Sequence, residues 1–155
     1  MLNLKFIINE NFKNFQDFLL KIRSYFKENQ NTIHKARNEI KVINYENKDF
    51  VVKSFKIPHL INKFVYTFCK DSKAKKSYEY SLKIGEFTPK PVGYIEFYKN
   101  SLINESYFVS EKFEYDFTIR EPLLDINFPN KNEILKAFAK FTFDLHQAGI
   151  FHFDY

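Results

Sequence analysis

The apolar residues of this chain change from helical to strand spacing several times, and the resulting order of elements restricts the fold more than any other feature. The chain carries no internal repeat and no linker rich in proline, glycine or serine, so one continuous architecture is expected. The predicted elements, in chain order, are a strand at 2–8, a helix from about 9 to 28, strands at 32–34, 39–44 and 50–55, helices after Pro58 and after Asp71 or Ser72, strands at 92–97 and 105–113, and a helix at 130–148 that Gly149 ends. We therefore predict an α+β fold with an antiparallel sheet of about five strands, an extra N-terminal strand and helix, and a pair of helices.

Within the predicted helices, the apolar spacing names the residues expected to face inward. The stripe of the first helix is Phe12, Phe15, Phe18, Leu19, Ile22 and Phe26. Ala74, Tyr78 and Leu82 form the stripe of the helix that ends at Gly85. The stripe of the last helix, which is predicted to begin at Asn130 or Asn132, is Ile134, Leu135, Phe138, Phe141 and Leu145.

The net charge of +5 is unevenly distributed. Residues 1–100 hold 19 Lys and Arg against 10 Asp and Glu, a net charge of +9, whereas residues 101–155 have a net charge of −4. A cationic surface of this kind is either a solvated surface or one that meets nucleotide phosphate, nucleic acid or an acidic membrane. The lysines of residues 70–76 are the densest group, and anionic lipid headgroups are one partner that they suit.

The cysteine and histidine content argues against metal binding and disulfides. Cys69 is the single cysteine, and His34, His59 and His146 lack the spacing of metal ligands. No apolar run has the length of a membrane span, and residues 2–8 are too short for a signal peptide. We therefore predict no metal site within the chain and a cytoplasmic location.

The residues after the last predicted helix form a candidate catalytic loop. They read Leu-His-x-x-Gly-Ile-x-His-x-Asp from Leu145 to Asp154, a helix end followed by a glycine stop, a short apolar strand and a His-x-Asp turn. Protein kinases present the aspartate that aligns the acceptor hydroxyl in a loop of the H-R-D type. Phe153 stands where the arginine of that motif would be, so activation through a phosphorylated loop is not expected.

Two upstream residues complete the kinase-like order. Lys53 follows Val51 and Val52 on the third predicted strand of the meander, as the lysine of a V-A-I-K strand does, and Glu79 lies within the helix that follows. In kinases this lysine binds the α and β phosphates and is held by the helix glutamate. A glycine-rich loop is absent from the turn at 35–38, so Arg37 and Asn38 are the candidates to replace its phosphate contacts.

Together these features resemble the bacterial lipopolysaccharide core kinases, which phosphorylate Kdo or heptose. The segments that carry the resemblance are 37–41, 52–56, 73–80, 88–96 and 145–154. It implies a kinase-like N-terminal lobe at 1–113 and, at 114–155, the hinge and the first long helix of the C-terminal lobe. It further implies that Lys53 and Glu79 hold ATP, that Ser110 and Glu111 in the hinge at 110–113 contact adenine, and that Asp154, supported by His152, acts on a sugar hydroxyl.

The same resemblance implies what the complete enzyme needs besides these residues. It needs ATP and Mg²⁺, and the Mg²⁺-binding asparagine and Asp-Phe-Gly segment are expected beyond Tyr155, so we expect no phosphoryl transfer by this chain alone. The implied partners are a nucleotide and a lipopolysaccharide core or lipid A sugar, with peripheral contact to the anionic inner membrane. Without a larger helical lobe, the apolar face of the 130–148 helix would be exposed and favour self-association.

Two alternatives remain open at this level. A kinase-like module that binds its partners without catalysis would keep the same strands and helices but lose the chemistry. A basic nucleic-acid-binding domain is supported by the charge alone, has no motif behind it, and is not the expected partner class.

Overall fold

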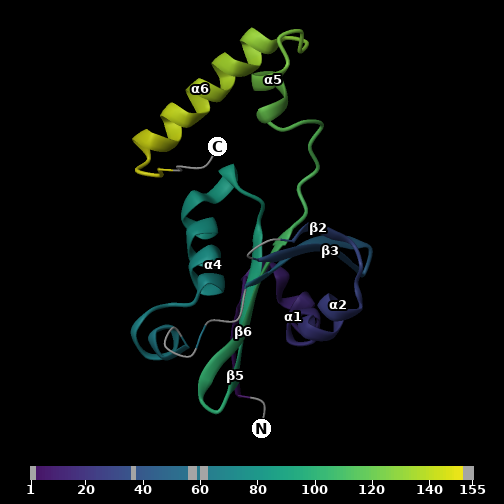
Figure 1. Ribbon diagram of the computed structural model, residues 1–155, viewed down its shortest axis with the longest axis vertical. Coiled ribbons are helices and arrows are strands. Elements are labelled where there is room, and N and C mark those ends of the chain that lie inside the picture. The colour runs from purple at the N-terminus through teal and green to yellow at the C-terminus, as the bar shows by residue number, and fades with distance from the viewer. Residues whose placement is uncertain (1–2, 36–37, 56–58, 60–62, 152–155) are drawn as a thin grey trace. The chain divides into compact units, whose positions relative to one another are not determined.

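The structure is a computed structural model that describes residues 3–35, 38–55, 59 and 63–151. The chain divides into two compact units, Met1–Phe113 and Glu114–Tyr155. The described part of the first unit is an antiparallel sheet with helices on both faces, and that of the second is helical (Figure 1). The predicted α+β class is therefore confirmed.

The first unit is organised by one six-stranded sheet in which every neighbouring pair is antiparallel. The strand order is β1-β5-β6-β4-β3-β2. The strands are β1 (Asn3–Ile8), β2 (Thr32–Lys35), β3 (Glu39–Tyr45), β4 (Lys48–Phe55), β5 (Pro91–Lys99) and β6 (Leu102–Glu111). β1 is the extra N-terminal strand of the prediction, and it pairs with β5 at the edge of the sheet.

Two tight hairpin turns set the register of neighbouring strands. Glu46 and Asn47 join β3 to β4, and Asn100 and Ser101 join β5 to β6; all four residues have positive φ. Two-residue turns with positive φ match the twist of the strands they connect. The predicted turn at 99–101 is therefore in place, but β6 begins at Leu102 rather than at residue 105 and ends at Glu111 rather than at 113. The predicted boundaries were wrong because a two-residue turn lets pairing resume at once.

The edge strand β1 approaches β5 most closely at Gly93. A Cβ atom at this position would lie 2.5 Å from the backbone oxygen of Ile7 and 3.0 Å from a methyl group of Leu19. Asn9 then ties the end of β1 to β5, because its backbone amide donates to Val92 O at 2.8 Å and its side chain to Pro91 O at 3.0 Å. The absence of a side chain at Gly93 is therefore what permits this pairing.

One face of the sheet is covered by a helical run consisting of η1 (Glu10–Phe15), α1 (Gln16–Leu20) and α2 (Ile22–Glu28). The run is one predicted helix broken at Lys21, whose φ of −97° and ψ of 10° are not helical. The whole predicted stripe is buried. Phe18 packs against Phe50 and Tyr45 with ring centroids 5.1 and 4.9 Å away. This aromatic core holds the helical run to the sheet.

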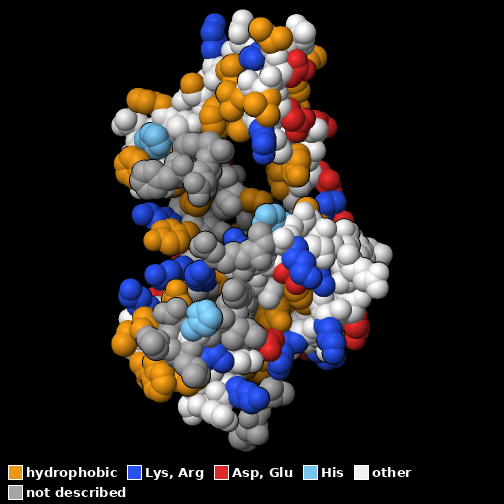
Figure 2. All heavy atoms as spheres, in the orientation of Figure 1, with side chains coloured by type: hydrophobic (Ala, Val, Ile, Leu, Met, Phe, Trp, Pro, Cys, Tyr) orange, Lys and Arg blue, Asp and Glu red, His pale blue; other side chains and the backbone are white. Residues whose placement is uncertain are grey.

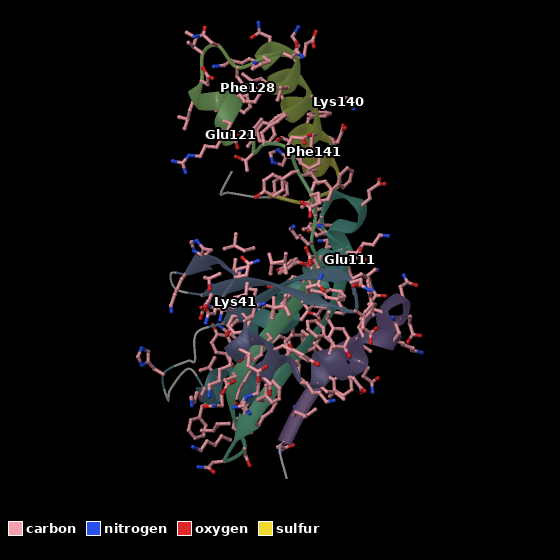
Figure 3. The ribbon with its side chains drawn as sticks, turned by 90° about the vertical axis from the view of Figure 1, so that its right-hand side faces the viewer. Lys41, Glu111, Glu121, Phe128, Lys140 and Phe141 are labelled. Carbon is pink, nitrogen blue, oxygen red and sulfur yellow. The ribbon has the colours of Figure 1, made fainter. Side chains whose placement is uncertain are left out.

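Lys41 on β3 also faces α2, although it is a lysine (labelled in Figure 3). Its side chain is 10% exposed, and Nζ donates to the carbonyl oxygens of Phe26 at 2.8 Å and Asn29 at 2.7 Å. These carbonyls lie at the C-terminal end of α2, where backbone acceptors have no partner within the helix. The ammonium group therefore closes the end of α2.

The opposite face is partly covered by α4 (Lys73–Ile84) (Figure 1). Ser72 caps it as predicted, because its Oγ accepts from the backbone amide of Lys75 at 3.1 Å, and the helix ends at Gly85, which has a φ of +66°. The inward residues are Ala74, Tyr78 and Ser81. Leu82 was predicted to face inward but is 50% exposed, since the buried stripe continues three residues after Tyr78 rather than four.

A π-helical turn, η2 (Val65–Cys69), precedes α4. Thr67 attaches it to the sheet, because its Oγ1 accepts from the backbone amide of Ile103 at 3.0 Å. The helix predicted after Pro58 falls partly outside the described residues, and from residue 63 to 69 the structure is helical as predicted.

The second unit contains the short helix α5 (Arg120–Leu124), which was not predicted, and α6 (Lys131–Gln147). Phe117 and Phe128 pack edge to face beside them, with ring centroids 5.0 Å apart (Phe128 is labelled in Figure 3). Asn130 stands at the N-cap position of α6, with positive φ and without a side-chain cap. Its left-handed backbone turns the chain into the helix, so Asn130 begins α6 as predicted.

The end of α6 is the predicted glycine stop. Gly149 has a φ of +71°, and the amides of Gly149 and Ile150 donate to His146 O and Leu145 O, a Schellman motif. The face expected to be exposed is only partly so, because Leu145 is buried and Ile134, Phe138 and Phe141 are half-buried. Self-association through this helix therefore stays a prediction. Within the described residues, the helices are all too short or too polar to cross a bilayer.

Candidate functional site

Lys53 lies on the face of the sheet that α4 partly covers. Side chains alternate along β4, so Phe50 and Val52 enter the aromatic core on one face while Val51, Lys53 and Phe55 lie on the other. Lys53 is half-buried, and its Nζ stands 5.3 Å from the centroid of the Phe55 ring. The strand pattern therefore places this lysine on a different face from the residues that form the main core.

The neighbours of Lys53 on this face come from the strands on either side. Directly opposite residues of an antiparallel pair share a face, and Lys53 lies opposite Ile40 on β3 and Phe108 on β6. Val51, one position along the same face, lies opposite Val42 and Ser110. We call this group the Lys53 surface; its members are Ile40, Val42, Val51, Lys53, Phe108 and Ser110.

The Lys53 surface is largely apolar and only partly covered. Ser110 is buried at 7% exposure, and the other five members are half-buried. A half-buried apolar strip with one cation at its edge can pack a flat, apolar ring system and neutralise an attached anion. Ser110 and Lys53 were predicted as site residues, whereas Ile40, Val42 and Phe108 were not. The cross-strand register, which the sequence does not display directly, is what brings them together.

Glu79 does not meet Lys53 in the structure. Its carboxylate is 52% exposed and lies 3.7 Å from Lys75 Nζ, one helical turn earlier on α4. The inward row of α4 is Ala74, Tyr78 and Ser81, so Lys75 and Glu79 share the flank of the helix. The two predicted partners, both within the described residues, form no ion pair with each other, and the carboxylate is engaged along its own helix instead.

The predicted hinge residues take part in the hydrogen bonds that end the sheet. The amide of Glu111 donates to Lys90 O at 3.0 Å, and that of Lys112 donates to Asp49 O at 3.0 Å. The carboxylate of Glu111, labelled in Figure 3, accepts from Lys48 Nζ at 3.0 Å. Because these amides are already used, any adenine contact of this segment falls to its carbonyl groups and to Phe113.

The remaining predicted site residues are placed only in part. Asn38 is described and immediately precedes β3. Arg37, His152 and Asp154 lie outside the described residues, so the structure does not relate them to Lys53. Among the residues that are described, no three His, Cys, Asp or Glu side chains are grouped to hold a metal ion.

Tyr78 of α4 and Tyr94 of β5 close the space between α4 and the sheet beside the Lys53 surface. Their ring centroids are 5.7 Å apart, and both belong to the small buried cluster with Phe55 and Ala74. Burial raises the pKa of both phenols, so they remain uncharged beneath the helix. This contact fixes α4 against β5.

Comparison of the chain with protein families, with curated proteins and with solved structures found no match.

Proposed function

We propose that the Lys53 surface binds a nucleoside triphosphate and that the chain is part of an ATP-dependent phosphotransferase with a kinase-like fold. The observation that carries the proposal is the position of Lys53. It lies on the third strand of the meander, on the face shared with the following helix, and beside half-buried apolar residues from two neighbouring strands. This combination suits a purine ring with an attached triphosphate.

In this arrangement the side chains have separate roles. Val51, Ile40 and Phe108 pack against the base, while the ammonium group of Lys53 neutralises a phosphate. A lysine donates to phosphate as a compact point charge, so its contribution depends on a position near the phosphates rather than on a fixed angle. Glu79 can support Lys53 only after it leaves Lys75, and an exposed ion pair of this kind contributes only about 0.3–0.5 kcal/mol.

The resemblance to lipopolysaccharide core kinases extends the proposal to an acceptor. The transferred phosphoryl group would pass to a sugar hydroxyl of Kdo, heptose or lipid A, with Asp154 aligning that hydroxyl and Mg²⁺ neutralising the phosphates. These assignments rest on the sequence motifs. The order of strands, helix and glycine stop along the chain supports them.

Nucleotide binding can be measured with a fluorescent ATP analogue. We expect Lys53→Met to weaken binding about tenfold, because a charge-assisted hydrogen bond to phosphate is lost. Lys99→Met is the matched control, since Lys99 is an exposed lysine at the end of β5. Equal affinities of the Lys53→Met variant and the unaltered chain would refute the assignment, as would equal losses in the two variants.

A non-catalytic kinase-like binding module is the second candidate, and the engagement of Glu79 by Lys75 favours it. This module would bind the nucleotide at the Lys53 surface without transferring phosphate. A radiolabelled phosphoryl-transfer assay on the complete protein distinguishes the two: turnover that Asp154→Asn abolishes supports the enzyme, whereas nucleotide binding without turnover supports the module.

A further inference from the structure

A second site lies on the same face of the sheet, over β1 and β5 rather than over β3 and β4. It is a groove of about 600 Å³ between these strands, the η2 turn and the start of α4. Its lining includes Lys5, Lys70, Lys75, Lys76, Glu96 and Tyr98. None of these residues belongs to the Lys53 surface, so the groove is a separate candidate site.

The groove holds an excess of positive charge. Lys75 is neutralised, because it lies 2.6 Å from Asp71 and 3.7 Å from Glu79. Lys5, Lys70 and Lys76 make no ion pair with any carboxylate of the described residues. The lining holds four lysines against the carboxylates of Asp71 and Glu96, and this excess of positive charge around one concavity suits an anion such as phosphate.

The wall of the groove adds a buried acceptor. Glu96 is 6% exposed, and its Oε2 accepts from the hydroxyl of Tyr98 at 2.6 Å. No donor from the described part of the chain reaches Oε1. Burial, and then the hydrogen bond to Glu96, raise the pKa of Tyr98, so the phenol stays a donor and occupies only one oxygen. The other oxygen can accept from a hydroxyl group of a ligand.

Two exposed phenylalanines stand beside this opening. Phe64 is 57% exposed and Phe68 69% exposed, and their ring centroids are 6.1 Å apart. Phe68 also lines the groove. The η2 turn is anchored through Thr67, so the rings are held outward rather than packed in the core. Figure 2 shows hydrophobic and cationic side chains together on this part of the surface. Aromatic side chains next to lysines are typical of segments that lie in a membrane interface.

We propose that the groove binds the phosphate-bearing, hydroxylated headgroup of an anionic lipid, and that Phe64 and Phe68 insert into the interfacial region of the bilayer beside it. The lysines neutralise the phosphate, and Glu96 accepts from a headgroup hydroxyl. The charge of the groove and the position of the exposed rings select a lipid surface rather than a soluble phosphate. This inference does not depend on nucleotide binding at the Lys53 surface.

Sedimentation with vesicles tests the proposal. The full chain is mixed with vesicles of phosphatidylcholine alone or with about 30% phosphatidylglycerol, whose headgroup carries phosphate and hydroxyls. We expect binding only to the second kind, and weaker binding as salt is raised. Lys70→Gln with Lys76→Gln should weaken it about 25-fold, since each lysine near an anionic surface contributes about a fivefold factor. Phe64→Ala with Phe68→Ala should weaken it about tenfold or more.

Matched controls separate the groove from general charge and general hydrophobicity. Lys21→Gln with Lys27→Gln removes two exposed lysines on the opposite side of the sheet, and Ile33→Ala with Leu124→Ala removes two exposed apolar side chains elsewhere. Both controls should bind within about threefold of the unaltered chain. Losses in the controls equal to those of the groove variants would overturn the proposal.

Two further arms test the source of the phosphate and the part played by Glu96. Glycerol 3-phosphate in solution is titrated by NMR; if it shifts the groove resonances while vesicles of both kinds remain unbound, the ligand is a soluble phosphate and the membrane proposal fails. Glu96→Gln removes a negative charge as well as the carboxylate acceptor, so the hydroxyl contact is read from the ratio of two affinities. Binding to phosphatidylglycerol should fall relative to binding to phosphatidic acid, which lacks the hydroxylated headgroup. An unchanged ratio would contradict the hydroxyl contact.

Discussion

The two faces of the six-stranded sheet are covered in different ways. On the α1–α2 face, aromatic and aliphatic residues from the helical run and from β3, β4, β5 and β6 form one continuous core, in which Phe18 and Phe50 are 0% exposed. On the α4 face, the buried cluster holds only Phe55, Ala74, Tyr78 and Tyr94, and beside it lie the mostly half-buried Lys53 surface and the groove lined by lysines. The first face therefore holds the unit together, and the second leaves room for ligands.

The same difference distinguishes two lysines on the neighbouring strands β3 and β4. Lys41 on β3 is buried against α2, and its ammonium group donates hydrogen bonds to two backbone carbonyl groups. Lys53 on β4 is half-buried on the other face, without a carboxylate at ion-pair distance in the described structure. A lysine whose hydrogen bonds are complete stabilises the fold, whereas one that is left partly open can bind an anion.

The largest effect on this comparison is expected from the centre of the aromatic core. Phe18→Ala removes a side chain that is 0% exposed and should lower the free energy of unfolding by about 3–5 kcal/mol. Phe68→Ala, at the 69% exposed position beside the groove, should change it by less than about 0.5 kcal/mol. Urea denaturation measures both. A loss of less than about 1 kcal/mol in Phe18→Ala would mean that the core can collapse around the gap.

A smaller effect separates the two lysines. Lys41→Met leaves the carbonyls of Phe26 and Asn29 without their donor and should cost about 1–3 kcal/mol of folding stability. Lys53→Met should leave stability within about 0.5 kcal/mol while it weakens nucleotide binding. Thermal and urea unfolding of the two variants give the comparison. If Lys53→Met proves as destabilising as Lys41→Met, the α4 face has a structural role that its partial exposure does not suggest.

The smallest effect concerns the pH dependence of stability on the aromatic face. The pKa of Tyr107 is raised, first by burial and then by Glu105, whose Oε2 accepts from its hydroxyl at 3.0 Å. At high pH the unfolded chain binds fewer protons than the folded chain, because Tyr107 loses its proton at a lower pH when the chain is unfolded. The contribution of Tyr107 to the free energy of unfolding is therefore complete below about pH 10, the pKa of tyrosine in the unfolded chain. It is lost as the pH rises through the pKa of Tyr107 in the folded chain.

Tyr107→Phe tests this dependence. At neutral pH the variant should be less stable by about 1 kcal/mol, the net value of the lost hydrogen bond. The difference from the unaltered chain should shrink above about pH 10, because only the unaltered chain gains free energy by ionising Tyr107 on unfolding. Urea unfolding at several pH values measures it, with the 60% exposed Tyr80→Phe as control. A difference that stays constant with pH would show that Glu105 and burial do not control this phenol.

Much of the fold was predictable from local patterns. The stripe from Phe12 to Phe26 identified the helical run and its buried face, since one helical period reports one face. Ser72, Gly85 and Gly149 marked helix ends as their capping chemistry requires. The predicted inward stripe of α4 was wrong at its last residue. Leu82 and Ser81 lie on either side of the inward face, and packing against β5 buries Ser81.

The candidate sites were predictable only where one short segment carries the chemistry. The alternation of side chains along β4 predicted that Lys53 and Val52 lie on opposite faces of the sheet. The local sequence did not predict that Glu79 pairs with Lys75. The members of the groove are farther apart still: Lys5 lies opposite Glu96 only because β1 pairs with β5 at the edge of the sheet. Such a pairing depends on the close approach at Gly93 and on burial of the whole helical run.

The sequence by itself thus determined most of the order of strands and helices, the residues that the helical run contributes to the aromatic core, and the lysine on the third strand of the meander. These follow from periodicity and capping, which act over a few neighbouring residues. Tertiary structure alone decided which residues surround Lys53, which partner Glu79 takes, and how lysines from β1 and α4 come to line one groove with the buried carboxylate of Glu96. Those outcomes depend on strand register and on competition between charged partners, and both are settled by contacts between segments far apart in the chain.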